Sequence, residues 1–157
     1  MFLEKSRSKI NEEFLKYKEM FGDREYPMKE ICEKIDSCSE ELALAVKYLY
    51  VTAPLSDAVN TPFETIYDYA EHGLYLYENL ESVRKLPEDI FLNYVLAHRV
   101  NEEEVLPCRS FFWSLLKDRI QGKNQYAAAI EVNYWCAEEA TYHSGDDRTL
   151  PALTVYR

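Results

Sequence analysis

Apolar side chains recur every three or four residues along most of the chain, and this spacing predicts a succession of helices. A first helix is expected over residues 5–20, ending before Gly22, and a short second helix over 28–35. Residues 42–51 are apolar on nearly every side, which is typical of a helix at the centre of its domain. The apolar face predicted for the first helix consists of Ile10, Phe14, Tyr17 and either Met20 or Phe21.

Two capping signals precede the next helices. Ser37 and Glu40 fit a capping box, in which the serine accepts a backbone N–H and the glutamate reaches back to the cap. After a connection at 55–60, Thr61 is expected to cap a helix with Pro62 at its first position, where a missing N–H is harmless. Glu64 is expected to complete a capping box with Thr61. The apolar stripe predicted for this helix is Phe63, Ile66, Tyr67, Ala70, Leu74 and Tyr77.

The second half of the chain repeats this pattern. Pro87, Glu88 and Asp89 are expected to begin a helix that closes at 98–101, with Ile90, Phe91, Tyr94 and Val95 on its core face. Residues 107–120 are expected to form another helix, which Gly122 ends, with Phe111, Phe112, Leu115 and Leu116 facing inward. Asn124 is expected to cap a last helix that includes Ala127–Ile130 and Trp135. The sequence therefore predicts an all-α, single-domain bundle of about seven helices with a C-terminal tail.

The composition supports an all-α fold and limits the classes of molecule that the chain is expected to bind. The chain has 157 residues, the size of one domain, and only 4 Gly and 6 Pro, which favours long helices over many tight turns. A formal net charge of -10 argues against nucleic acid or an anionic membrane, because phosphate binding draws most of its affinity from Lys and Arg. We find no signal peptide and no stretch long enough to span a bilayer, so a cytoplasmic protein is expected.

Few residues suggest chemistry. Cys32, Cys38, Cys108 and Cys136 form no C-x-x-C pair and are expected to be reduced, mostly buried thiols. Cys136 and His143 are the one cysteine and histidine near each other in sequence, and a thiol nucleophile needs such a base, but a buried helix thiol is the simpler interpretation. The pairs Asp68 with His72 and Glu139 with His143 have helical spacing, and surface ion pairs are favoured over a metal site. No cofactor or metal is predicted.

Three segments together resemble a known family. They are APLSDAVNTPFE at 53–64, LPEDIFLNYVLAHRVNEE at 86–103, and EVNYWC at 131–136 with the later DDRTLPAL at 146–153. Their order is similar to the N-terminal half of bacterial transglutaminase-like proteins, relatives of the papain-like cysteine hydrolases. The resemblance implies that residues 1–125 are a helical N-terminal region. It implies that 126–157 are the first helix and loop of the core, packed as one domain with the rest.

In that family the catalytic cysteine follows this loop, usually in an R-C-G-E-type motif, and the histidine and aspartate come later. Cys136 matches a helix position and not the nucleophile, so no catalytic residue carries over. The resemblance implies a non-catalytic region whose partner is the C-terminal core that holds the Cys-His-Asp triad for amide hydrolysis or acyl transfer, with a protein as one class of substrate. The alternative is a stand-alone acidic helical module that binds a basic protein.

Overall fold

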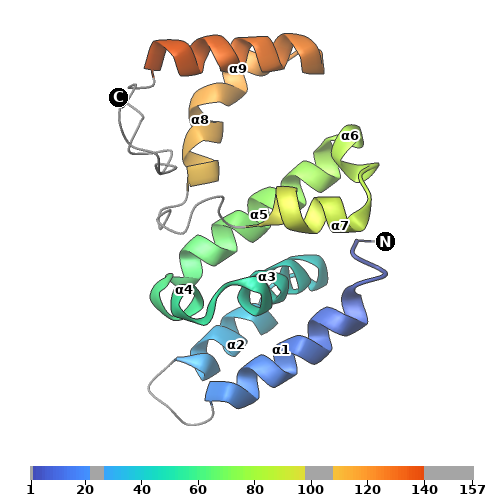
Figure 1. Ribbon diagram of the computed structural model, residues 1–157, viewed down its shortest axis with the longest axis vertical. Helices are drawn as coiled ribbons and strands as arrows, with labels where there is room; N and C mark the ends of the chain where they lie inside the picture. The colour runs from blue at the N-terminus through green and yellow to red at the C-terminus, as the bar shows by residue number, and fades with distance from the viewer. Residues whose placement is uncertain (1, 22–26, 98–107, 140–157) are drawn as a thin grey trace. The chain divides into compact units, whose positions relative to one another are not determined.

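The computed structural model describes residues 2–21, 27–97 and 108–139, and its regular elements in these ranges are all helices (Figure 1). This confirms the all-α fold class. The chain divides into two compact units, Met1–His98 and Arg99–Arg157, which are described separately. The elements are α1 (Arg7–Phe21), α2 (Met28–Asp36), α3 (Glu40–Thr52), α4 (Leu55–Asn60), α5 (Phe63–Asn79), α6 (Glu81–Arg84), α7 (Glu88–Ile90), the π-helix η1 (Phe91–Leu96), α8 (Cys108–Ile120) and α9 (Gln125–Glu139).

The first unit is organised around α3, as its apolar sequence predicts. Helices α1, α2 and α5 all pack against α3. Ala45, Val46, Leu49 and Tyr50 are completely buried. Each large side chain buried in this way stabilises the unit by about 1.5–3 kcal/mol relative to exposure. The predicted face of α1 is also confirmed, with Phe21 rather than Met20 completing it: its buried residues are Ile10, Phe14, Tyr17 and Phe21.

The segment before α1 is held against α7, although the two are far apart in sequence. The backbone N–H groups of Lys5 and Ser6 donate hydrogen bonds to the Glu88 carboxylate, at 3.3 and 2.8 Å. Phe2 is buried, and its ring contacts the rings of Tyr77 and Phe91 at centroid distances of 5.0 and 5.8 Å. The carboxylate thereby satisfies N–H groups that the start of a helix leaves without partners.

The capping box predicted for α3 is wrong by two residues. Ser39 is the N-cap, and its side chain accepts a hydrogen bond from the backbone N–H of Leu42 at 3.3 Å. Ser37 instead ends α2, and its hydroxyl donates to the carbonyl of Lys34. The Glu40 carboxylate does not reach back to the cap because it pairs with Arg7 of α1.

The region expected to connect α3 and α5 differs in two ways. Residues 55–60 are a helix, α4, with Ala58 buried. Pro62 precedes α5 in an extended conformation, and no side chain caps that helix, so Thr61 does not serve as the predicted cap. Glu64, expected to complete a capping box, forms an ion pair with Lys34 of α2 instead. The predicted stripe is nevertheless confirmed, since Ile66 and Ala70 are fully buried and its other members pack against the core.

The helix predicted after Pro87 forms, but most of it is a π-helix. A π-helix has a wider turn with i→i+5 hydrogen bonds, so the buried side chains recur at a different spacing from that of an α-helix. Phe91, Leu92 and Leu96 are buried, whereas Ile90 and Tyr94, both expected in the core, are 37% and 77% exposed. The predicted close at 98–101 lies outside the described residues.

The second unit contributes α8 and α9, which pack against each other. Gly122 adopts a φ of 74° just after α8, and Asn124 caps α9 by accepting a hydrogen bond from the N–H of Ala127 at 2.9 Å, so both terminal signals are confirmed. The rings of Phe112 and Trp135 meet edge to face at 5.9 Å. The boundary expected at 125/126 falls just after the first residue of α9 and stays a prediction.

Candidate functional site

The cysteines do not form a reactive centre in the described ranges. Cys136 is exposed on α9, so the expected burial of this thiol is wrong. Cys32 and Cys38 are half-buried free thiols, and burial raises the pKa of Cys38, whose Sγ lies 3.3 Å from the carbonyl oxygen of Lys34. His143 lies outside the described residues, so its pairing with Cys136 or with Glu139 stays a prediction.

The remaining metal candidate is the pair Asp68 and His72 on α5. Both residues are half-buried, and they lie one turn apart. Within 2–21, 27–97 and 108–139, no group of three or more His, Cys, Asp or Glu side chains is placed to hold a metal ion. A two-residue pair supplies only two of the four ligands of a tetrahedral ion such as zinc, fewer than structural or catalytic zinc sites use.

An apolar stripe on α9 is the most conspicuous surface of the second unit. Tyr126, Ile130 and Tyr134 are 78%, 39% and 64% exposed. Because they follow one another at four-residue intervals, they lie on the same side of the helix. We call these three residues the α9 stripe. Large exposed apolar side chains that gather on one face mark a surface that contacts another molecule or domain.

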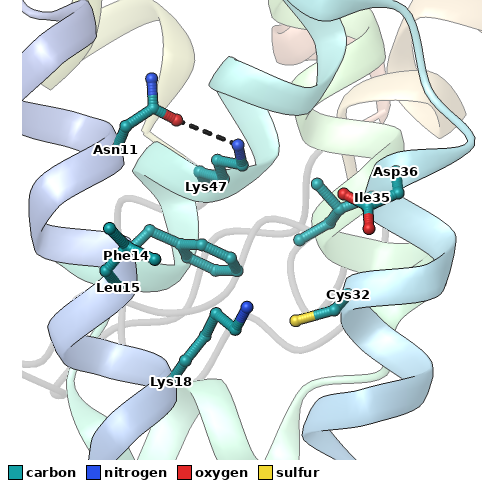
Figure 2. A pocket seen from close by; sticks show the side chains of 8 residues that line it. All are labelled: Asn11, Phe14, Leu15, Lys18, Cys32, Ile35, Asp36 and Lys47. Carbon is teal, nitrogen blue, oxygen red and sulfur yellow. Dashed lines mark hydrogen bonds between the residues drawn. The ribbon is translucent and has the colours of Figure 1, made fainter.

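A pocket lies in the first unit where α1, α2 and α3 meet, with a volume of about 210 Å³ (Figure 2). Helix α1 supplies four of its residues at positions i, i+3, i+4 and i+7, which is one helix face. Helix α2 supplies three, and α3 supplies Lys47. We call this the α1–α2–α3 pocket; its lining residues are Asn11, Phe14, Leu15, Lys18, Cys32, Ile35, Asp36 and Lys47.

The polar groups of the pocket are held in a definite arrangement. Lys47 is half-buried and donates a hydrogen bond from Nζ to Asn11 Oδ1 at 2.9 Å. Asn11 is in turn oriented by a hydrogen bond from its Nδ2 to the carbonyl of Arg7. Lys47 Nζ also lies 5.8 Å from the centroid of the Phe14 ring. In Figure 2 the ends of Lys18 and Cys32 point toward each other from α1 and α2. Sequence reasoning missed this site, and its one signal was the spacing of Asn11, Phe14, Leu15 and Lys18.

A second pocket, of about 310 Å³, lies where α2 meets the start of α5. Its cation, Lys34, forms ion pairs with Glu64 and Glu30, each at 3.0 Å, and lies 5.1 Å from the centroid of the Phe63 ring. Hydrogen bonding to Glu64, and then to Glu30, raises the pKa of Lys34, and the same contact with Lys34 lowers the pKa of Glu64. The positive charge of Lys34 is thus neutralised by two carboxylates of the same pocket, so it is not available to an anionic ligand.

No protein-family model matches the chain, and no curated protein or solved structure matches it either. None of the helices in the described ranges combines the length and apolar character needed to cross a bilayer.

Proposed function

We propose that this chain is the helical, non-catalytic region of a transglutaminase-like cysteine enzyme, and that it supports a catalytic core which carries the Cys-His-Asp triad. The enzyme hydrolyses amides or transfers acyl groups. The proposal starts from the resemblance of 53–64, 86–103 and 131–153 to that family. The α9 stripe is the structural observation that supports it.

The α9 stripe fits this role because of where the resemblance places it. In the family, the segment that resembles 131–136 is part of the first helix of the core, so the resemblance implies that the rest of a core would cover part of α9. Here its exposed face consists of Tyr126, Ile130 and Tyr134. A buried aromatic side chain removes about 150–250 Å² from water, and at roughly 25 cal/mol per Å² each tyrosine would contribute several kcal/mol to such a contact.

The block at 86–103 offers a second feature in keeping with the proposal. Its described part contains η1, and π-helical turns are frequent at functional sites. On this segment Leu86, Ile90 and Tyr94 are all exposed, again at intervals of four residues in the sequence. These exposed apolar side chains, like those of the α9 stripe, are available for further contacts.

The experiment is to read the coding frame beyond Arg157, express the protein that it encodes, and assay amide hydrolysis and acyl transfer. We expect the frame to supply a cysteine in a Gly-rich turn, then a histidine and an aspartate, and the longer protein to be active while the 157-residue chain is not. A stop codon directly after Arg157, together with a natural mass of 18.5 kDa, would contradict the proposal.

Surface variants test whether the α9 stripe supports the core. Tyr126→Ser with Tyr134→Ser should lower the melting temperature and the activity of the longer protein while hardly changing the isolated chain. Tyr75→Ser is the matched control, since Tyr75 is a 43% exposed tyrosine of α5 in the first unit. Equal losses in the stripe variant and the control would count against a contact at the stripe.

The net charge of -10 favours a second candidate, a stand-alone module that binds a basic protein. The two proposals differ in their response to salt. Exposed charges are screened over about 10 Å at 0.1 M ionic strength, so binding through an acidic surface weakens as salt rises, whereas contact through the α9 stripe does not. A complex isolated from the source cell that dissociates at moderate salt would support the second candidate.

A further inference from the structure

The α1–α2–α3 pocket contains an ammonium group that is neutralised by no carboxylate of the described residues. Among the described residues, the other lysines whose ammonium groups contact a polar side chain form ion pairs with carboxylates. Examples are Lys16 with Glu12 and Lys85 with Glu81, each at 2.7 Å. The Lys47 ammonium instead donates a hydrogen bond to the neutral side chain of Asn11, although acidic residues outnumber basic ones in the chain by 28 to 18. A half-buried charge without a counter-charge is unfavourable, and an anionic ligand would relieve that cost.

The ammonium of Lys47 is also positioned in advance of any ligand. Asn11 takes one of its three N–H donors, and the hydrogen bond from Asn11 to the Arg7 carbonyl fixes the amide that does so. The remaining donors are left for an acceptor in the pocket. Because the Lys47–Asn11 contact already restricts the side chain, a ligand would lose less conformational entropy on binding there.

The remaining lining residues define what kind of anion fits. Leu15, which is 58% exposed, gives the pocket an apolar wall on α1, and the buried side chains of Phe14 and Ile35 close its inner end. Its volume of about 210 Å³ is below the roughly 300–1,000 Å³ of sites for drug-sized ligands. Lys18 adds a second positive charge from α1, while Asp36 places a negative charge on the α2 side, which disfavours a second anionic group there.

We infer that the α1–α2–α3 pocket binds a small organic monocarboxylate, with its carboxylate on Lys47 Nζ and its apolar body against Leu15 and the edge of Phe14. This site is independent of the proposed catalytic partner, because all of its residues belong to the first unit. It is a binding site with no chemical step.

The test uses benzoate as the probe and benzamide as its neutral counterpart of nearly the same shape. Both are titrated to millimolar concentration into the ¹⁵N-labelled 157-residue chain, and amide shifts are followed by NMR. Benzoate should give saturable shifts at Asn11, Cys32 and Lys47, and benzamide should bind at least about tenfold more weakly, a difference of about 1.4 kcal/mol. Equal binding of the two probes, or no saturable shift with benzoate, would overturn the inference.

Two variants locate the charge that matters. Lys47→Met keeps most of the aliphatic stem and should weaken benzoate binding about tenfold. Lys16→Met is the matched control, since Lys16 lies on α1, is 65% exposed and is not part of the pocket, and it should leave binding unchanged. Lys18→Met, at a more exposed position, should weaken binding by a smaller factor. Because an exposed substitution is less disruptive, this variant still tests the pocket if Lys47→Met fails to fold. An unchanged affinity in Lys47→Met would contradict the inference, whatever the result for Lys18→Met.

Cys32 provides a second readout inside the same molecule. Its half-buried thiol lines the pocket, whereas the exposed thiol of Cys136 belongs to the other unit. Bound benzoate should slow alkylation of Cys32 by iodoacetamide and leave the rate at Cys136 unchanged, as followed by mass spectrometry of tryptic peptides. Equal slowing at both cysteines, or none at Cys32, would show that benzoate does not occupy the pocket.

Discussion

The two units bury their apolar residues to very different extents. In Met1–His98 the helices surround α3, and Val46, Leu49 and Tyr50 have no exposed surface. In the described part of Arg99–Arg157, Trp135 is the one buried large side chain, while α8 and α9 leave Phe111, Leu115 and the α9 stripe partly or mostly exposed. Since burial of apolar surface is the main favourable term in folding, the first unit contains its own core and the second gains more from a further contact.

The largest difference should come from matched truncations of one aliphatic side chain in each unit. Leu49→Ala removes a fully buried side chain from α3 and should lower the free energy of unfolding by about 2–5 kcal/mol. Ile130→Ala removes a 39% exposed side chain from α9 and should lower it by about 0.5–1 kcal/mol. Urea denaturation followed by circular dichroism measures both. Similar losses would mean that α9 is covered as fully as α3.

Glycine replacements compare packing between the units. An alanine Cβ at Gly73 would lie 2.7 Å from Leu96 Cδ1, and Leu96 is fully buried, so its side chain must move within the core; we expect a net loss of about 1–2 kcal/mol. Gly122 has open space around it but a φ of 74°, so Gly122→Ala should lose about 1 kcal/mol through backbone strain alone. The crystal structure of each variant distinguishes the causes, because only Gly73→Ala should displace the side chain of Leu96. A Gly73→Ala protein as stable as wild type would show that α5 and η1 are packed less tightly than described.

The two side-chain N-caps test whether the units unfold separately. Ser39 caps α3 and Asn124 caps α9, each through a hydrogen bond to the N–H three residues later. Replacing either by alanine should cost about 1 kcal/mol. Hydrogen exchange should show the loss from Asn124→Ala in α9 and not in α3, with Ser37→Ala as a nearly neutral control. If Asn124→Ala weakened the protection of α3 equally, the units would open together.

The smallest effect concerns the ion pairs and depends on pH. The contact with Lys34 lowers the pKa of Glu64 from its ordinary value of 4.5, so this pair stabilises the fold above that pH and its contribution is lost as pH falls through the lowered pKa. Wild type and Lys34→Met should therefore differ in melting temperature at neutral pH and converge in acid. The difference is small, because both partners are largely exposed and screened. A difference that widened in acid would have the wrong sign.

The sequence predicted the helical class because apolar spacing directly reflects burial, as at Ile10, Phe14 and Tyr17. It did not predict the outward position of Tyr94, because the wider turn of η1 changes which residues share a face and the sequence carries no clear signal for a π-helix. Competition between partners explains the wrong capping boxes, since Glu40 and Glu64 pair with Arg7 and Lys34 on other helices. Which partner each glutamate binds therefore depends on the tertiary structure, which brings the helices together.

The candidate site was less accessible to prediction. The α1–α2–α3 pocket depends on Lys47 meeting Asn11 across 36 positions of the chain, and one sequence shows no such pairing. The α9 stripe was partly visible, because residues four apart, such as Ile130 and Tyr134, share one side of a helix, but their exposure depends on what surrounds that helix. The segment 140–157 that follows it lies outside the described residues.

Hydrogen exchange of the isolated 157-residue chain tests the central claim most directly. The amides of Ala45–Tyr50 in α3 should exchange only through global unfolding of the first unit, while those of Ile130–Tyr134 in α9 should exchange much faster, through local opening of the second unit. Slow exchange in α9, equal to that in α3, would contradict the account, because it would show that the second unit already forms a complete core without a further contact.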